Sequence, residues 1–230
     1  MKSMVFDSST IISLSLNNLL YLLPELKHRF NGQFFITEAV KKELIDNPMH
    51  SRKFKLEALQ IHQLILDNTI EIYGQQLEKQ TQHLLNLINN LFKAENHFIR
   101  LVDQAEVESL VLANLLKATY AVDERTIRML VEDPNELKNL FEKKLHTKIT
   151  INQDNLKELK KEIDINILRS SELGLVAYSL GLLKNLTQRD HLTDYNLKRE
   201  LVDGILWGLK LNGCSISQEE IEQVERTEGF

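Results

Sequence analysis

Three short apolar runs, each ending in a polar residue that can cap a helix, constrain the fold of this chain most strongly. The runs and the residues that follow them are 4–6 with Asp7, 34–36 with Thr37, and 118–122 with Asp123. Valine, phenylalanine and isoleucine favour strands, whereas aspartate and threonine are preferred helix N-caps. Apolar residues at helical spacing follow, most clearly over residues 11–26. This alternation predicts an α/β fold with a parallel sheet flanked by helices.

Acidic residues gather near the predicted ends of these strands. Asp7 and Asp123 follow two strands directly, and Glu43 lies a turn or more into the helix after the second strand. Asp103 and Glu106, three residues apart, share one face at the start of another helix. Ligands of parallel sheets bind beyond the carboxyl ends of the strands, so we expect these acids to converge.

Converging carboxylates repel one another and raise each other's pKa values unless a cation neutralises them. Oxygen ligands without cysteine or histidine favour Mg²⁺ or Mn²⁺ over Zn²⁺. The seven histidines show no ligand spacing, so we expect no zinc site. Taken singly, each acid has an equally good explanation as a helix cap, because acids are favoured in the first turn of a helix.

Four segments resemble the PIN-domain nucleases in their order and approximate spacing. They are VFDSS at 5–9, TEAVKKE at 37–43, DQAEVE at 103–108 and AVDERTIR at 121–128. The resemblance implies a PIN-like central parallel sheet and cleavage of RNA with three or four acids and Mg²⁺ or Mn²⁺.

Carried over to this chain, the resemblance implies the following site. The catalytic acids are Asp7, Glu43, Glu106 and Asp123, and the metal ligands are Asp7, Asp103, Glu106 and Asp123. Ser9 matches a small polar residue that supports the first acid. Ala105 replaces the family's usual glycine and Asp103 is a spare acid, so the nearer ligand of Asp103 and Glu106 stays open. Glu124 is expected at the surface or in a supporting position.

Basic residues offer possible contacts to RNA. Arg125 and Arg128 follow Asp123 and are candidate phosphate ligands, although pairing with neighbouring acids is their default role. Residues 54–100 have a mostly helical pattern with one possible strand at 70–73, and we expect an amphipathic hairpin packed on the main body. The alternative is an arm beside a substrate groove, using the residues Lys79, His83, Lys93, His97 and Arg100.

The resemblance extends to residues 167–175 and 181–183, which look like the last strand and helix of some archaeal and bacterial PIN proteins. It therefore implies a PIN-like nuclease domain over 1–184, with an insertion at about 134–162. A helical extension over 185–230 follows, containing a helix at 197–211 and a capping box that begins at Ser217.

The composition narrows the classes of function. The net charge of -5 argues against a polycation that coats nucleic acid, but not against a nuclease with a local acidic site. The single cysteine, Cys214, fits a reducing compartment, and no apolar run is long enough for a membrane helix. The beginning of the chain does not match a signal peptide, so we expect a soluble, cytoplasmic protein without a membrane partner.

Together, these observations predict a Mg²⁺- or Mn²⁺-dependent ribonuclease in RNA processing or turnover, with RNA as its partner. Two alternatives stay open. One is the ribonuclease toxin of a toxin–antitoxin pair, and the other is a catalytically silent PIN module that binds RNA or a protein. A homodimer formed through the apolar face of residues 197–211 is plausible on this pattern.

Overall fold

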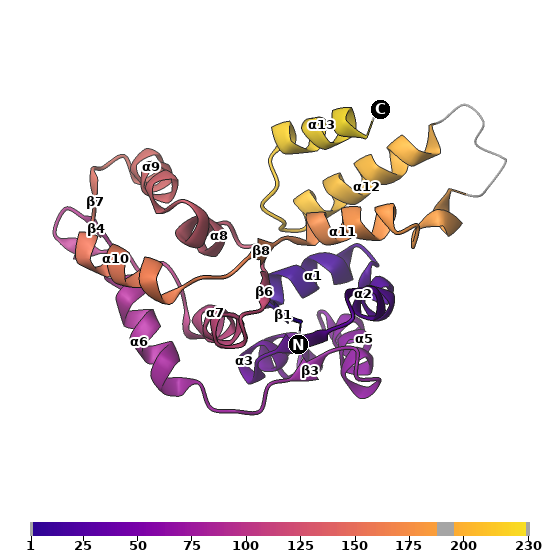
Figure 1. Ribbon diagram of the computed structural model, residues 1–230, viewed down its shortest axis with the longest axis horizontal. Helices are drawn as coiled ribbons and strands as arrows, with labels where there is room; N and C mark the ends of the chain where they lie inside the picture. The colour runs from indigo at the N-terminus through magenta and orange to yellow at the C-terminus, as the bar shows by residue number, and fades with distance from the viewer. Residues whose placement is uncertain (1, 188–195, 229–230) are drawn as a thin grey trace.

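The computed structural model describes residues 2–187 and 196–228 of the chain. Its elements, labelled in Figure 1, are β1 (Ser3–Phe6), α1 (Ser8–Leu16), η1 (Leu20–Leu22), α2 (Leu23–Phe30), β2 (Gln33–Ile36), α3 (Glu38–Lys41), η2 (Lys42–Asp46), α4 (Asn47–Met49), α5 (Lys55–Leu66), β3 (Glu71–Ile72), α6 (Glu78–Asn89), β4 (Phe92–Ala94), β5 (His97–Phe98), α7 (Gln104–Leu116), β6 (Thr119–Ala121), α8 (Arg125–Glu132), α9 (Pro134–Leu145), β7 (Ile149–Ile151), α10 (Gln153–Glu162), β8 (Ile167–Leu168), α11 (Ser170–Ser179), η3 (Lys184–Leu186), α12 (Leu197–Leu211) and α13 (Gln218–Thr227).

Five strands form a parallel sheet in the spatial order β3-β2-β1-β6-β8. Val5 of β1 is in register with Phe35 of β2 on one side and with Tyr120 of β6 on the other. The strand order therefore reverses between β1 and β6, which is where α/β sheets open a ligand crevice beyond the carboxyl ends of the strands. The predicted α/β class and parallel sheet are confirmed.

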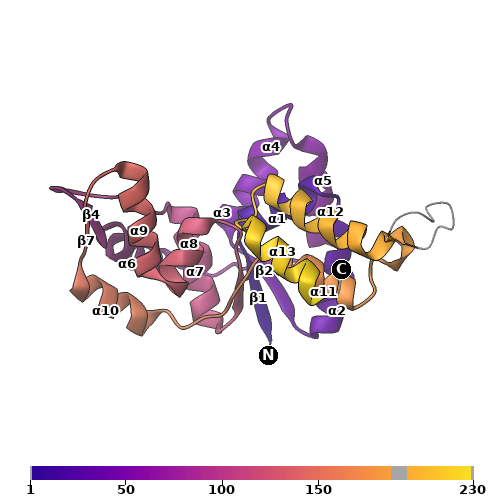
Figure 2. The same cartoon turned by 90° about the horizontal axis from the view of Figure 1, so that it is seen from above.

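Successive side chains of β1 pack into two separate hydrophobic cores. Met4 and Phe6 pack into a core shared with α1, α2, α11 and α12, whereas Val5 packs into a core shared with α6, α7 and α8. Successive residues of a strand point to opposite faces, so both faces of the sheet are covered. Figures 1 and 2 show the two resulting groups of helices on either side of the sheet.

The helix predicted over residues 11–26 is interrupted, so that expectation was wrong. Helix α1 ends at Leu16, and Asn18 adopts a left-handed backbone with φ of 55°. Asparagine tolerates this conformation better than most residues. The chain enters helix α2 only later, with Pro24 in its first turn. Apolar spacing alone did not reveal the turn because Leu14, Leu19 and Leu20 on its two sides are apolar and buried, so the pattern continues across Asn17 and Asn18.

A second, antiparallel sheet, in the order β5-β4-β7, lies beside the main one. Strands β4 and β5 form a hairpin inside the segment expected to be mostly helical, which corrects that expectation. Strand β7 comes from the segment expected as an insertion, and Phe92 of β4 is in register with Ile151 of β7. Phe92 is fully buried and meets Phe141 of α9 edge to face, with ring centroids 6.0 Å apart. The hairpin and residues 134–162 therefore share one packed unit.

Helix α12 has the bounds that its sequence pattern predicted, and it packs along α11. The two helices approach closely at Gly174, where a Cβ atom would lie 2.8 Å from Ile205 Cγ2. Helix α13 begins with the predicted capping box of Ser217 and Glu220. The expected start of the extension, residue 185, falls in η3, and residues 188–195 lie outside the described part of the chain.

Across the described residues, every helix is either too short or too polar to cross a lipid bilayer.

Candidate active site

Asp7 follows β1 directly and caps helix α1. Its Oδ2 accepts hydrogen bonds from Ser9 N, at 2.9 Å, and from the Ser9 hydroxyl, and its Oδ1 accepts one from the Tyr120 hydroxyl at 3.3 Å. The residue is only 3% exposed. Burial raises the pKa of Asp7 to about 6, against the hydrogen bonds from Ser9, and the charge of Glu43 adds to the rise. Asp7 is thus a desolvated carboxylate held by two hydroxyls and an amide.

Asp103 and Glu106 form a capping box at the start of α7. Oδ1 of Asp103 accepts from Ala105 N at 2.9 Å and from Glu106 N at 3.1 Å, and Oε2 of Glu106 accepts from Asp103 N at 2.7 Å. The cap reading of these acids is therefore correct for both residues. The capping box uses only one oxygen of each carboxylate, Oδ1 of Asp103 and Oε2 of Glu106.

Glu106 is also tied to the edge of the main sheet. Its backbone carbonyl oxygen lies 3.4 Å from the Tyr120 hydroxyl, whose single proton is shared between this carbonyl and Asp7 Oδ1. Partial burial of the side chain raises the pKa of Glu106 to about 7, against the hydrogen bond from Asp103 N. The charges of Asp103, Glu124 and Asp7 raise this pKa further. Of the two acids in the capping box, Asp103 is exposed, and Glu106 is the half-buried one that feels the charge of Asp7.

Glu43 lies in a π-helical turn, η2, which follows the short helix α3. Such turns are rare and occur frequently at functional sites, because they redirect the side chains around them. Glu43 is exposed, and its charge contributes to the raised pKa of Asp7. The predicted second acid thus lies close enough to the first to act on its charge.

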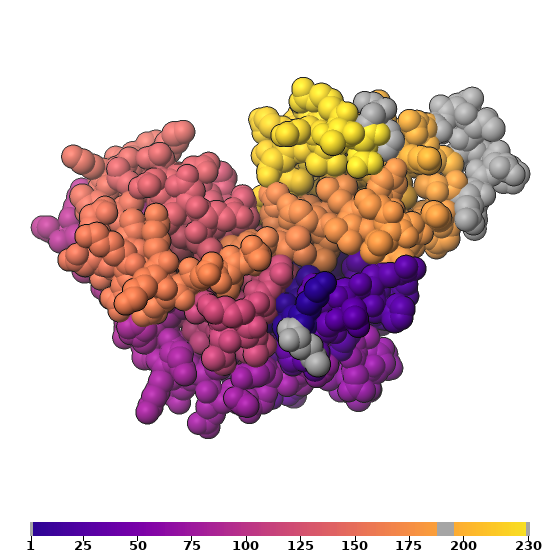
Figure 3. Space-filling model, in the orientation of Figure 1, coloured from indigo at the N-terminus to yellow at the C-terminus, as the bar shows by residue number. Residues whose placement is uncertain are grey.

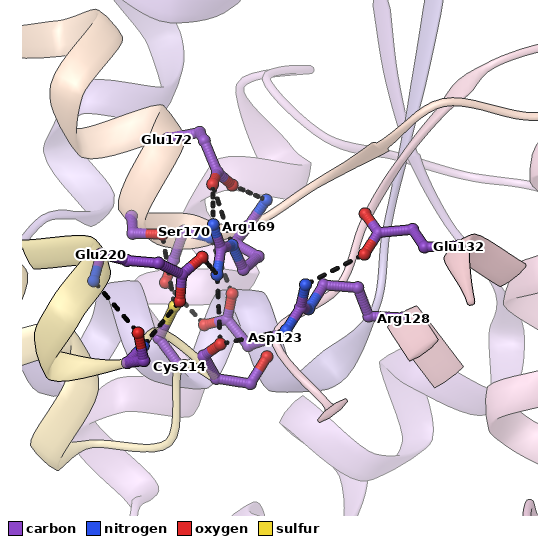
Figure 4. A network of polar contacts seen from close by, with 11 residues as sticks. Asp123, Arg128, Glu132, Arg169, Ser170, Glu172, Cys214 and Glu220 are labelled. Atoms are coloured by element: carbon purple, nitrogen blue, oxygen red, sulfur yellow. Dashed lines mark hydrogen bonds and ion pairs between the residues drawn. The ribbon is translucent and has the colours of Figure 1, made fainter. Parts of the chain in front are cut away.

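Asp123 is fully buried and faces in another direction, toward the start of α11 (Figure 4). Its Oδ1 accepts from Ser170 N at 2.7 Å, and its Oδ2 accepts from the Ser170 hydroxyl at 2.6 Å. Its own backbone N donates to the Ser9 hydroxyl at 3.1 Å. Ser9 therefore bridges the two strand ends, because the same hydroxyl donates to Asp7. Buried Cys214 lies nearby, and burial raises the pKa of its thiol.

Ser215 joins the C-terminal segment to the residue after β6. Its backbone N donates to the Asp123 carbonyl at 3.1 Å, and its own carbonyl accepts from Arg169 Nη1 at 3.1 Å. Arg169 also pairs with Glu172 and, at 2.9 Å, with Glu220 of α13 (Figure 4). Partial burial disfavours the charged guanidinium, but the bonds to these two carboxylates outweigh it and raise the pKa of Arg169.

The candidate phosphate ligands line a polar cavity of about 540 Å³ between α8–α9 and the start of α13. The surface is notched between these helices in Figure 3. Arg128 pairs with Glu132 at 2.9 Å, the default role expected for it, and its Nε is buried without a hydrogen-bond partner. Arg125 is exposed, and within the described chain it forms no ion pair. Lys210 adds a third cation to the cavity wall.

The predicted acids thus divide into two groups. The charge of Glu43 acts on Asp7 and the charge of Asp7 acts on Glu106, whereas the carboxylate of Asp123 is bonded to Ser170. In the described part of the chain, these acids are not close enough for three ligand atoms to lie within 4.8 Å of one another. The group that meets this criterion is His83, Glu158 and Glu162, so the structure brings together ligands that the sequence spacing did not reveal.

Sequence reasoning missed Tyr120 and Ser170, and it expected Glu124 at the surface or in a supporting position. Glu124 caps α8 through a 2.7 Å bond from Ile127 N, and its charge contributes to the raised pKa of Glu106. Tyr120 donates to Asp7, and Ser170 holds Asp123. The available signals were the adjacency of Glu124 to Asp123 and the position of Ser170 just after the last predicted strand. Nothing in the local pattern marked Tyr120.

No protein-family model, curated protein or solved structure matches this chain.

Proposed function

We propose that this protein is a Mg²⁺- or Mn²⁺-dependent ribonuclease that hydrolyses phosphodiester bonds of RNA, in RNA processing or turnover. One observation carries the proposal, namely the gathering of Asp7, Glu43, Glu106 and Glu124 where the strand order of the sheet reverses. Two of these carboxylates, Asp7 and Glu106, have pKa values raised to about 6 and about 7. Clustered, desolvated acids at such a position are typical of a functional site.

The side chains at this edge are of the chemical type that a hard divalent cation prefers, although among the described residues no three of their oxygens lie within 4.8 Å of one another. All the donors are carboxylate oxygens, and Mg²⁺ and Mn²⁺ prefer such ligands. Asp7 is buried and Glu106 half-buried, and a bound cation would offset both their desolvation and the repulsion among the acids. When bound, the ion would act as a Lewis acid on a phosphoryl oxygen.

Asp7 and Glu106 are the proposed principal ligands, with Glu43 and Glu124 completing the acidic edge. Ser9 and Tyr120 fix the orientation of the Asp7 carboxylate. Asp123, the fourth acid of the PIN resemblance, is proposed to position the edge, because its contacts with Ser9 and Ser170 hold the ends of neighbouring strands together. Its remaining lone pairs leave a direct role at the metal open to experiment.

RNA is the proposed substrate on the basis of the PIN resemblance. The overall charge of -5 means that phosphate must be attracted locally. Arg125, Arg128 and Lys210 supply positive charge in the cavity beside Asp123. Three glutamates, Glu136, Glu219 and Glu220, also line this cavity. We therefore expect it to hold at most one or two phosphates of a strand rather than to serve as a long binding track.

The first test is a calorimetric titration of Mn²⁺ into the wild type, Asp7→Asn and Asp133→Asn. Asp133 is a matched control because it also caps a helix, accepting from Asn135 N and Glu136 N at 3.0 Å, but lies away from the acidic edge. Asparagine is an equally good N-cap, so neither change should unfold its helix. We expect saturable Mn²⁺ binding that is lost in Asp7→Asn and retained in Asp133→Asn. Equal binding by all three proteins would contradict the proposed ligand.

The second test separates a nuclease from a silent module. Wild type, Glu106→Gln and Glu132→Gln are incubated with end-labelled single-stranded and structured RNA in Mn²⁺ or EDTA. We expect Mn²⁺-dependent cleavage by the wild type and Glu132→Gln, reduced at least about 100-fold in Glu106→Gln, as for loss of one strongly stabilising catalytic group. RNA binding without cleavage by every protein would favour a binding module and overturn the proposal.

A further inference from the structure

A second group of metal-ligating side chains lies far from the acidic edge, where α6 meets α10. His83 comes from α6, and Glu158 and Glu162 lie four residues apart on α10. His83 Nε2 is 2.8 Å from Glu162 Oε1 and 3.6 Å from Glu158 Oε1. All three ligand atoms lie within 4.8 Å of one another.

An ordinary ion pair does not account for this arrangement. The Nε2 atom of an imidazole carries one proton and can direct it to one acceptor. Glu162 receives that bond, so Glu158 is held near the same nitrogen without a hydrogen bond of its own to any described residue. Two carboxylates thus converge on a group that supplies at most one positive charge. A divalent cation would balance the charge of the cluster.

The lysines of α10 are not used to balance these acids. Lys157, Lys160 and Lys161 are neighbours of Glu158 and Glu162 in the sequence. Within the described residues, none of the three lysines forms an ion pair with either acid. The two glutamates instead pair with His83 of α6, at a position where Glu158 is exposed and Glu162 is half-buried.

The separations match those between the ligands of a tetrahedral ion. Ligands about 2.0–2.1 Å from a tetrahedral metal lie roughly 3.3 Å from each other, and the two distances from His83 Nε2 fall on either side of this value. One imidazole nitrogen and two carboxylate oxygens form a set that suits Zn²⁺, with a fourth position left for water.

The helices that carry the ligands are held in place by buried leucines. Leu84 and Leu87 of α6 and Leu156 and Leu159 of α10 are buried in the same hydrophobic core. A cavity of about 330 Å³ adjoins the cluster and is lined by His83, Glu162, Gln80 and Asn114. This cavity gives room for a water ligand and polar groups to hold it.

We propose that His83, Glu158 and Glu162 form a Zn²⁺ site that fastens α10 to α6. The site is independent of the proposed nuclease centre and does not rest on it. The ligands join residues 153–162, from the segment expected as an insertion, to the helix before the β4–β5 hairpin, so a bound ion would hold these two helices together. Zinc would therefore strengthen the smaller, antiparallel part of the molecule without touching the acidic edge.

The test uses the full chain with Asp7→Asn and Glu106→Gln as a shared background, so that Zn²⁺ taken up at the acidic edge does not obscure the measurement. Zn²⁺ is titrated calorimetrically into this background and into versions that add His83→Ala, Glu158→Gln or His62→Ala. His62 is an exposed histidine on α5 and serves as the matched control. Co²⁺ replaces Zn²⁺ in a parallel titration, because tetrahedral Co²⁺ absorbs visible light.

We expect saturable Zn²⁺ binding with one ion per chain and the absorption of tetrahedral Co²⁺. The affinity should fall in His83→Ala and in Glu158→Gln by more than the roughly 10- to 100-fold that loss of an outer-shell partner costs. His62→Ala should leave it unchanged. Zn²⁺ should also raise the thermal midpoint of the background protein but not that of His83→Ala.

Three results would overturn the proposal. They are absence of saturable Zn²⁺ binding, binding that survives both His83→Ala and Glu158→Gln, and Co²⁺ bound only with octahedral absorption. Glu158→Gln keeps the inference testable if His83→Ala fails to fold, because Glu158 forms no hydrogen bond that the fold would lose. Failure of this site would leave the Mn²⁺ test at Asp7 unaffected.

Discussion

Asp7 and Asp123 follow neighbouring parallel strands and are both buried, but their surroundings differ. Asp123 receives both an amide and a hydroxyl from Ser170, which is the first residue of α11. Asp7 accepts its bonds from Ser9 and Tyr120, while the charge of Glu43 acts on it unfavourably. The comparison teaches that burial alone does not distinguish a structural carboxylate from a site for a cation. The donors and charges around it do.

The largest expected loss of stability comes from removing the carboxylate of Asp123, both oxygens of which accept hydrogen bonds from Ser170. Asp123→Ala leaves the amide and hydroxyl of Ser170 buried without an acceptor, at roughly 1–3 kcal/mol for each group. We expect the free energy of unfolding, measured with urea, to fall by about 2–6 kcal/mol. Asp133→Ala, which removes an exposed cap, should cost only about 1 kcal/mol. Similar losses in the two variants would remove the distinction drawn for Asp123.

In metal-free buffer, Asp7→Asn is expected to raise the free energy of unfolding instead of lowering it. Between its usual pKa of 3.8 and its folded pKa of about 6, Asp7 binds protons more tightly in the folded protein than in the unfolded chain. Folding stability contributed by this group therefore decreases as pH rises through that window and stays low above it. Asparagine carries no charge, so the variant should exceed wild type by about 1–3 kcal/mol at pH 8.

The pH dependence makes this prediction specific. The advantage of Asp7→Asn should shrink as the pH is lowered and should vanish below about pH 4, where the wild-type carboxyl is protonated in both states. Urea unfolding of both proteins between pH 3.5 and 8 measures it. If Asp7→Asn is less stable than wild type at pH 8, the charged Asp7 carboxylate stabilises the fold, as that of Asp123 is expected to do.

The smallest expected effect concerns Glu124, which the sequence analysis expected at the surface or in a supporting position. Glu124→Gln removes a charge that raises the pKa of Glu106, and glutamine keeps an oxygen to cap α8. We expect the pKa of Glu106 to move from about 7 toward its usual value, by less than one unit, in a carboxyl-carbon NMR titration without metal. Glu132→Gln, at the other end of α8, should leave the pKa of Glu106 unchanged. An unchanged pKa in Glu124→Gln would place Glu124 outside the acidic edge.

Local patterns in the sequence predicted the main sheet and much of its edge. The strand and cap at Phe6 and Asp7 are recognisable because both signals lie within a few residues. Helix α12 was predicted with its observed bounds because apolar spacing ends at Asn212 and Gly213. The antiparallel sheet was missed because its strands are only two or three residues long and because β7 joins the β4–β5 hairpin from a distant part of the chain.

The side-chain environments of the acids depended on the same kind of distant contact. Nothing near Asp123 in the sequence indicates Ser170 as its partner, since parallel pairing of β6 with β8 creates the contact. The group of His83 and the two glutamates was invisible to ligand-spacing rules because α6 and α10 meet only through the folded core. Spacing rules find ligands that share an element, and most ligands of these two clusters do not.

The bond from Ser215 N to the Asp123 carbonyl has a consequence for the order of events during synthesis. The groups that hold Asp123 come from residues 9, 170 and 215, so the earliest partner leaves the ribosome long before the last. A nascent chain that has reached only residue 160 has every acid of the candidate nuclease edge but neither Ser170 nor Ser215. The acidic edge therefore acquires its full support only after Ser170 and Ser215 have both been added to the chain.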